Sequence, residues 1–149
     1  MKKGDIFEGK VIRTEFPNKG IIDIEGQKVI VKNALEGQVV RFSINKKKRD
    51  KIEGRLLEVI EPSPIEQPAA CKHFGICGGC RYQGVPYEEQ LRKKQRYTEG
   101  LLKKFGKVEP IIGMEDPYYY RNKVHAAFGR DRKGNVISGI YEEKSHRIV

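Results

Sequence analysis

The chain has 149 residues, enough for one domain of ordinary size or for two small ones. Its 30 lysines and arginines outnumber its 20 acidic residues and give a formal net charge of +10. No apolar run approaches the ~20 residues that span a bilayer, and Gly4 and Asp5 stand where an export signal would need apolar residues. We therefore expect a cytoplasmic, non-membrane protein with a basic surface. Such a surface is typical of proteins that bind RNA, and solubility alone is the simpler alternative.

The first 62 residues have the pattern of short strands separated by turns. Apolar residues recur without a helical period and predict strands over residues 5–14, 21–24, 29–31, 40–44 and 52–60. In the fourth of these, Val40, Phe42 and Ile44 alternate with polar residues, as in a strand with one buried face. Five short strands with a small core predict a closed or nearly closed barrel of the OB type, because closure removes exposed sheet edges.

A run of four basic residues lies at the tip of the last predicted hairpin of this barrel. The run consists of Lys46, Lys47, Lys48 and Arg49. On a small barrel such a loop could neutralise phosphates of RNA and release their counterions, although a solvated turn has the same composition. Phe16 and Phe42 could stack on bases, but the alternation around Phe42 favours a place in the core.

Residues 61–70 contain three prolines and show no periodicity, which is typical of an extended linker. We therefore predict a barrel domain over residues 1–62, a Pro-rich linker over 63–70 and a second, partial domain over 71–149.

All three cysteines of the chain lie in one ten-residue stretch, residues 71–80. Cys71, Cys77 and Cys80 have the spacing C-x5-C-x2-C, and the glycines between the last two let the backbone turn tightly. Clustered thiols in a reducing compartment indicate metal binding rather than disulfides, and thiolates are soft ligands. An iron–sulfur cluster, a zinc ion and a metal-free loop all remain compatible with the spacing.

A fourth ligand would be needed for an ordinary iron–sulfur or zinc site. His73 lies inside the stretch, and His125 and His146 lie far from it in the sequence. A redox dithiol is disfavoured because no thioredoxin-like βαβ pattern surrounds Cys77 and Cys80.

The second half of the chain predicts one long helix followed by a hairpin. Pro86 and the acidic residues after it favour a helix start at Tyr87, and Gly106 favours an end after Phe105. Within this helix an apolar stripe alternates with a basic face. Alternating residues over 124–128 and 137–141, with a turn near Gly134, predict the hairpin, and a further strand begins near His146.

The chain resembles the N-terminal part of the RNA uracil-5-methyltransferases, in the branch with a TRAM domain and an iron–sulfur cluster. The pattern that carries this resemblance is Cys71, His73, Phe74, Cys77, Gly78, Gly79, Cys80, Gln83, Tyr87, Gln90, Leu91 and Lys94. Upstream, residues 20–37 look like a TRAM barrel. Downstream, Tyr120, Arg121, Asn122 and Lys123 look like the stretch that opens the central-domain sheet, where family members place basic side chains near the RNA.

The resemblance implies that Cys71, Cys77 and Cys80 bind a [4Fe-4S] cluster whose fourth cysteine ligand would lie just beyond Val149. It implies RNA contacts by Arg121 and Lys123. It also implies that the full family member forms 5-methyluridine with S-adenosylmethionine. Within the family, the combination of a cluster and a TRAM domain indicates ribosomal RNA as the substrate. The chain has no loop of the G-x-G-x-x-G type for S-adenosylmethionine, and its cysteines match cluster ligands rather than the catalytic nucleophile. We therefore expect no catalytic residue in this chain and no activity from it alone.

Two other functions are considered. The chain could be a free-standing RNA-binding module with a structural zinc or cluster loop. A radical methylthiotransferase is disfavoured, because its cluster motif has the spacing C-x3-C-x2-C and its TRAM domain lies at the C-terminal end.

Overall fold

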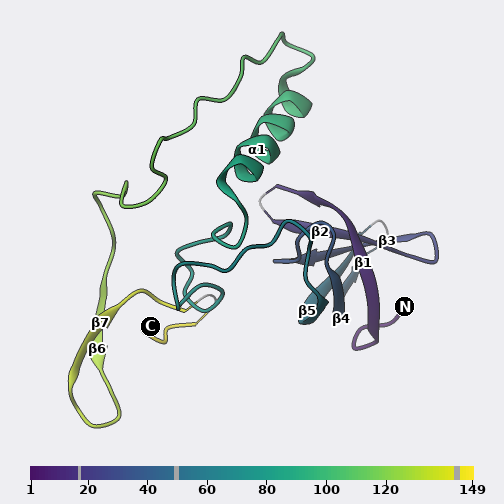
Figure 1. The fold of residues 1–149 in the computed structure, drawn as a ribbon. Helices are drawn as coiled ribbons and strands as arrows, with labels where there is room; N and C mark the ends of the chain where they lie inside the picture. Colours follow the sequence, from purple (N-terminus) through teal and green to yellow (C-terminus); the bar gives the residue numbers. More distant parts are fainter. Residues whose placement is uncertain (17, 49–50, 143–144) are drawn as a thin grey trace. The chain divides into compact units, whose positions relative to one another are not determined.

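The computed structural model describes residues 1–16, 18–48, 51–142 and 145–149, which form two compact units. The first unit spans Met1–Glu66 and the second spans Gln67–Val149, so the division falls within residues 63–70. The predicted fold class is confirmed: the chain is mainly β, with a closed five-stranded barrel, one helix and a two-stranded hairpin (Figure 1). Among the described residues, no helix is long and apolar enough to cross a membrane.

The first unit is a closed barrel with the strand order β1-β2-β3-β5-β4. Its strands are β1 (Ile6–Glu15), β2 (Lys19–Ile24), β3 (Gln27–Lys32), β4 (Val39–Lys48) and β5 (Lys51–Glu61). Four of the five strand pairs are antiparallel, and β3 and β5 pair in parallel. The last pair, β1 with β4, closes the barrel and leaves no strand edge unpaired.

The barrel core is built from the inward-facing residues that the alternation predicts. Phe42 is fully buried, and the ring of Phe7 lies 6.3 Å from it. Gly54 on β5 faces the Phe42 ring so closely that an added Cβ would lie 2.7 Å from the Phe42 Cδ2 atom. The other buried members of this cluster are Val11, Ile22, Val29, Val31, Ala34, Val40, Ile44 and Ile52.

Residues 63–66, at the start of the predicted linker, are attached to the barrel. The Ser63 hydroxyl donates to the Glu36 carbonyl oxygen at 2.6 Å, and the Gln38 side-chain amide donates to the Glu66 carboxylate at 2.7 Å. Both Ser63 and Gln38 are buried, so these bonds satisfy polar groups that water cannot reach.

The second unit contains helix α1 (Tyr87–Leu102), which is three residues shorter than predicted. The amides of Phe105 and Gly106 both donate to the Leu102 carbonyl, at 2.7 and 3.2 Å, so the chain turns tightly there instead of continuing the helix. No residue of α1 is buried, and Leu101 is 57% exposed. The apolar stripe is therefore present on α1 but is not part of a core in this unit.

The segment after α1 is bonded to residues along the helix. The Ile111 amide donates to the Gln95 side chain at 2.8 Å, and the Met114 amide donates to the Tyr87 hydroxyl at 2.9 Å. Gly113 lies against Leu91, where an added Cβ would be 2.7 Å from the Leu91 Cδ1 atom. Residues 111–114 are thus fixed to the first three turns of α1.

The predicted hairpin is formed by β6 (Ala127–Arg130) and β7 (Val136–Gly139). The Asp131 carboxylate orders the connecting turn by accepting hydrogen bonds from the amides of Lys133 and Asn135, at 2.8 and 2.9 Å. Strand structure begins at Ala127 and not at residue 124. At the end of the chain, Ile148 pairs with Tyr141 in an isolated antiparallel bridge near the position where a further strand was predicted.

Candidate metal-binding loop and RNA surface

The cysteine loop, residues 71–80, is a series of tight turns. The Phe74 amide donates to the Cys71 carbonyl at 3.0 Å, and the Ile76 and Cys77 amides both donate to the His73 carbonyl at 3.1 Å. Gly75 has a φ of +81°, which a residue with a side chain adopts only with strain. These turns fold the stretch between the first two cysteines back on itself.

One glutamine bonds to the start of the loop, and another orders the segment between the loop and α1. The Cys71 amide donates to the Gln83 side-chain oxygen at 2.9 Å. The Gln90 side-chain amide, in the first turn of α1, donates to the carbonyls of Tyr82 and Val85 at 3.1 and 2.9 Å. Both glutamines belong to the pattern on which the family resemblance rests, but the sequence alone assigns them no role. The structure identifies them as residues that position the loop and the helix start.

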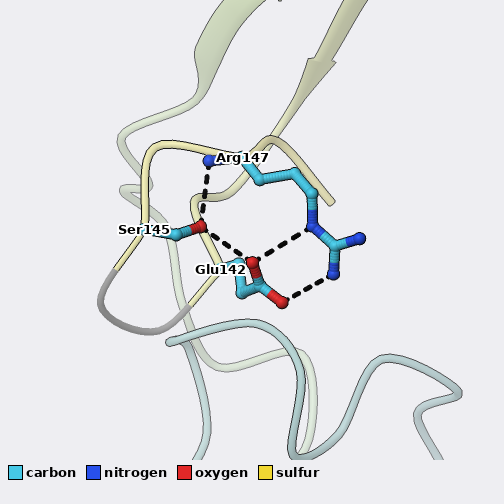
Figure 2. Close-up of polar contacts among 3 residues, drawn as sticks. All are labelled: Glu142, Ser145 and Arg147. Carbon is cyan, nitrogen blue, oxygen red and sulfur yellow. Dashed lines mark hydrogen bonds and ion pairs between the residues drawn. The ribbon is translucent and has the colours of Figure 1, made fainter.

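The last ten residues contact the loop from another direction. Cys77 forms an isolated antiparallel bridge with Glu142, and the Gly78 amide donates to the Tyr141 carbonyl at 3.1 Å. This contact lies next to a polar cluster of Glu142, Ser145 and Arg147, which Figure 2 shows.

Within this cluster the Glu142 carboxylate has three side-chain bonds. The Arg147 guanidinium donates to both carboxylate oxygens, at 3.1 and 2.6 Å, and the Ser145 hydroxyl donates to one of them at 2.8 Å. The pKa of Glu142 is lowered, first by the hydrogen bond from Arg147 and then by that from Ser145. The carboxylate is thus held in its ionised form beside the cysteine loop.

The three thiols are free of disulfides, with Cys71 and Cys77 half-buried and Cys80 exposed. In the described ranges, no three His, Cys, Asp or Glu side chains are gathered closely enough to hold a metal ion. Thiolates are the donor type that an iron–sulfur cluster requires, but the described positions of these three thiols are too far apart to hold a metal ion together. Of the alternative ligands, His146 packs its ring edge-on against Tyr141 at 5.5 Å.

Arg121 lies in the neighbourhood of the cysteine loop. Its guanidinium stands over the Tyr120 ring, 5.8 Å from the centroid. The pKa of Arg121 is raised, first by the hydrogen bond that it donates to the Tyr120 hydroxyl. Lys123 is exposed in a segment without regular structure.

The described part of the basic run, Lys46–Lys48, lies in a strand. Lys46, Lys47 and Lys48 are the last residues of β4 and are exposed, and Arg49 lies outside the described residues. The Lys47 ammonium donates to the Met1 carbonyl at 3.1 Å, whereas Lys46 is the register partner of Glu53 on β5. Phe42 is fully buried, so it belongs to the core and cannot stack on a base.

Comparison with known proteins places this chain among relatives with one shared name. It is 36% identical over its whole length to an uncharacterized RNA methyltransferase of Halalkalibacterium halodurans, of which it covers 33%. It is 41% identical over 93% of its length to one from Clostridium tetani, covering 31% of that protein. A relative from Caldanaerobacter subterraneus is 39% identical over 96% of the chain and is covered to 33%. No protein-family model matches the chain.

These relatives agree with the resemblance found in the sequence at the level of the RNA methyltransferases. The chain spans about a third of the length of the curated relatives it matches. Along its full length the chain is thus homologous to proteins named as RNA methyltransferases, consistent with an N-terminal part of such a protein.

Proposed function

We propose that this chain is the RNA-docking, cluster-binding N-terminal part of an S-adenosylmethionine-dependent RNA uracil-5-methyltransferase that makes 5-methyluridine in ribosomal RNA of the cytoplasm. The observation that carries the proposal is the match of the whole chain to RNA methyltransferases, together with an OB-like barrel at its start. Barrels of this kind bind single-stranded nucleic acid on a basic surface.

In this proposal Cys71, Cys77 and Cys80 would hold a [4Fe-4S] cluster. Support comes from the three free thiols in one loop and from the backbone bonds that anchor the loop at Cys71 and Cys77. When bound, the cluster would supply iron–thiolate bonds that cross-link the loop. Gln83 and Glu142 position the first two ligands through the backbone and contact no reacting atom.

The metal assignment is tested by anaerobic purification followed by analysis of iron, acid-labile sulfide and zinc. We expect iron and sulfide together with broad visible absorption, and their loss in the Cys77→Ala variant. Binding of one zinc ion with no visible absorption would overturn the cluster in favour of a structural zinc loop.

RNA docking is tested by gel shift of ribosomal RNA fragments over a range of salt concentrations. A basic protein that neutralises phosphates should lose affinity steeply with added salt. We expect contributions from Lys46, Lys47, Lys48, Arg49, Arg121 and Lys123. No shift at low salt would overturn the RNA role.

The chain alone is expected to transfer no methyl group, because the residues that would bind S-adenosylmethionine and attack uracil are not among its own. Incubation with uridine-containing RNA and labelled S-adenosylmethionine tests this expectation. Incorporation of label into the RNA by the purified chain would contradict it.

A further inference from the structure

Lysines of neighbouring strands, one of them from the basic run at the end of β4, gather around one carboxylate of the barrel wall. Lys32 on β3, Lys46 on β4 and Lys51 on β5 all act on Glu53 of β5. Together they lower the pKa of this carboxyl group, Lys51 most strongly through a 2.6 Å contact. These lysines come from three strands that are neighbours in the order β3-β5-β4, so they lie close together around one carboxylate.

Lys19 extends this group to a fourth strand. It is the register partner of Lys32 across β2 and β3, which places two like charges opposite each other. Its partner on the other side, Glu15, is already bonded to Lys28 and Arg13, each at 3.0 Å. Like charges that face each other across a sheet cost stability, so the barrel gains nothing in its folded state from this pair.

On another part of the barrel wall the ratio of cations to carboxylates is reversed. On the β1–β4–β5 side the Arg41 guanidinium is bonded to both Glu8 and Glu58, and its pKa is raised first by the hydrogen bond that it donates to Glu8. There one cation pairs with two carboxylates, whereas three lysines act on the single carboxylate of Glu53 and Lys19 lies opposite one of them. Within the described residues, Lys19, Lys32 and Lys46 form no salt bridge of their own.

We propose that these four lysines, Lys19, Lys32, Lys46 and Lys51, form a phosphate-binding band across β2, β3, β5 and β4 on which the backbone of single-stranded RNA lies. The band rests on the proposed RNA function and specifies its surface. Charge complementarity carries the choice of partner, because a row of cations across adjacent strands matches the repeated negative charge of a phosphate backbone. Glu53 holds Lys51 of the band through their 2.6 Å contact.

The test compares charge-neutral variants of the chain in binding to a labelled single-stranded oligoribonucleotide over a salt series. For the Lys19→Gln, Lys32→Gln double variant we expect the slope of log K against log salt to flatten by about 0.7 for each lysine removed. Lys10→Gln, an exposed lysine of β1 whose register partner is Val39, is the matched control and should leave the slope unchanged. Lys32→Arg keeps the charge and should bind as the wild type does.

The outcomes separate the band from the wider RNA function. If the wild type binds RNA and the double variant has the same salt slope, the band is overturned and RNA docking stands. The same holds if Lys10→Gln flattens the salt slope as much as removal of a band lysine does. Absence of wild-type binding would overturn both. Binding to vesicles of anionic lipid, with no binding to RNA, would also overturn the band as an RNA surface. Thermal unfolding of each variant checks that the fold is retained.

Discussion

Cys77 and Glu142 lie side by side in an antiparallel backbone bridge, although 64 intervening residues separate them in the chain. The bridge joins the loop that holds the thiols to the segment that contains the Glu142–Arg147 ion pair. Because Gly78 donates its amide to Tyr141 in the same contact, a change that loosens Tyr141 and Glu142 should also loosen Cys77 and its neighbour.

Weakening the ion pair should therefore loosen the cysteine loop. In Glu142→Gln the side chain can still accept a bond from Ser145, but the charge that attracts Arg147 is lost. We expect several-fold faster hydrogen exchange at the Gly78 amide. Glu88→Gln, an exposed change in the first turn of α1, is the control and should leave that amide unaffected. Equal exchange rates in the two variants would show that the pair does not support the loop.

The barrel core should depend strongly on Phe42. Truncation to Ala removes a fully buried ring that faces Gly54 and Phe7, and we expect a loss of about 3–5 kcal/mol in the free energy of unfolding. Phe105→Ala removes the same side chain where it is 85% exposed and should change stability by about 0.5 kcal/mol or less. Urea unfolding, together with hydrogen exchange of the barrel amides, measures the change in the free energy of unfolding for both variants. A small effect of Phe42→Ala would contradict the core described above.

Acid should weaken the barrel through Glu15. Hydrogen bonds from Lys28 first, and then from Arg13, lower the pKa of this carboxyl group from its usual 4.5. A group with a lowered folded-state pKa contributes stability above its unfolded-state pKa, and the contribution is lost as the pH falls through the folded-state value. Glu15→Gln should thus flatten the acid limb of stability against pH. Glu25→Gln, at the β2–β3 turn, should not flatten it.

The two units should differ in their ability to fold alone. Residues 1–66 contain nearly all the buried apolar side chains, whereas Val85 is the one buried apolar residue described in the second unit. We expect the fragment 1–66 to unfold cooperatively in urea and the fragment 67–149 to lose structure gradually. Calorimetry of each fragment tests this. A sharp transition in 67–149 would show that the unit has a core of its own.

Local patterns in the sequence predict the strands well. Val40, Phe42 and Ile44 face the core as their alternation requires, and the β2–β3 turn contains Gly26, as the sequence predicts. The parallel contact of β3 with β5 could not be read from such patterns, because it joins segments that no local period connects.

The same limit applies to the apolar stripe of α1. Periodicity identifies Leu101 and Phe105 as members of one stripe, but it does not say whether another element covers them. At the cysteine loop, sequence spacing identifies the donor types, while the positions of Gln83 and Glu142 depend on tertiary contacts. Neither the cysteine spacing nor these contacts predict whether the three thiols converge on one point, because a bound metal would itself supply the bonds that draw them together.

The parallel pairing of β3 with β5 also sets an order of events during folding. The β2–β3 and β4–β5 hairpins join residues close in sequence, whereas Val29 must find Ile52 across the whole intervening chain. Closing a loop of that length costs entropy before any contact between the two strands forms. The β3–β5 pair should therefore form after the hairpins. Substitutions at Val29 or Ile52 should therefore accelerate unfolding and leave the refolding rate nearly unchanged. The β1–β4 pair joins Ile6 to Ser43 across still more of the chain, so the closed barrel depends on two late contacts, β3–β5 and β1–β4.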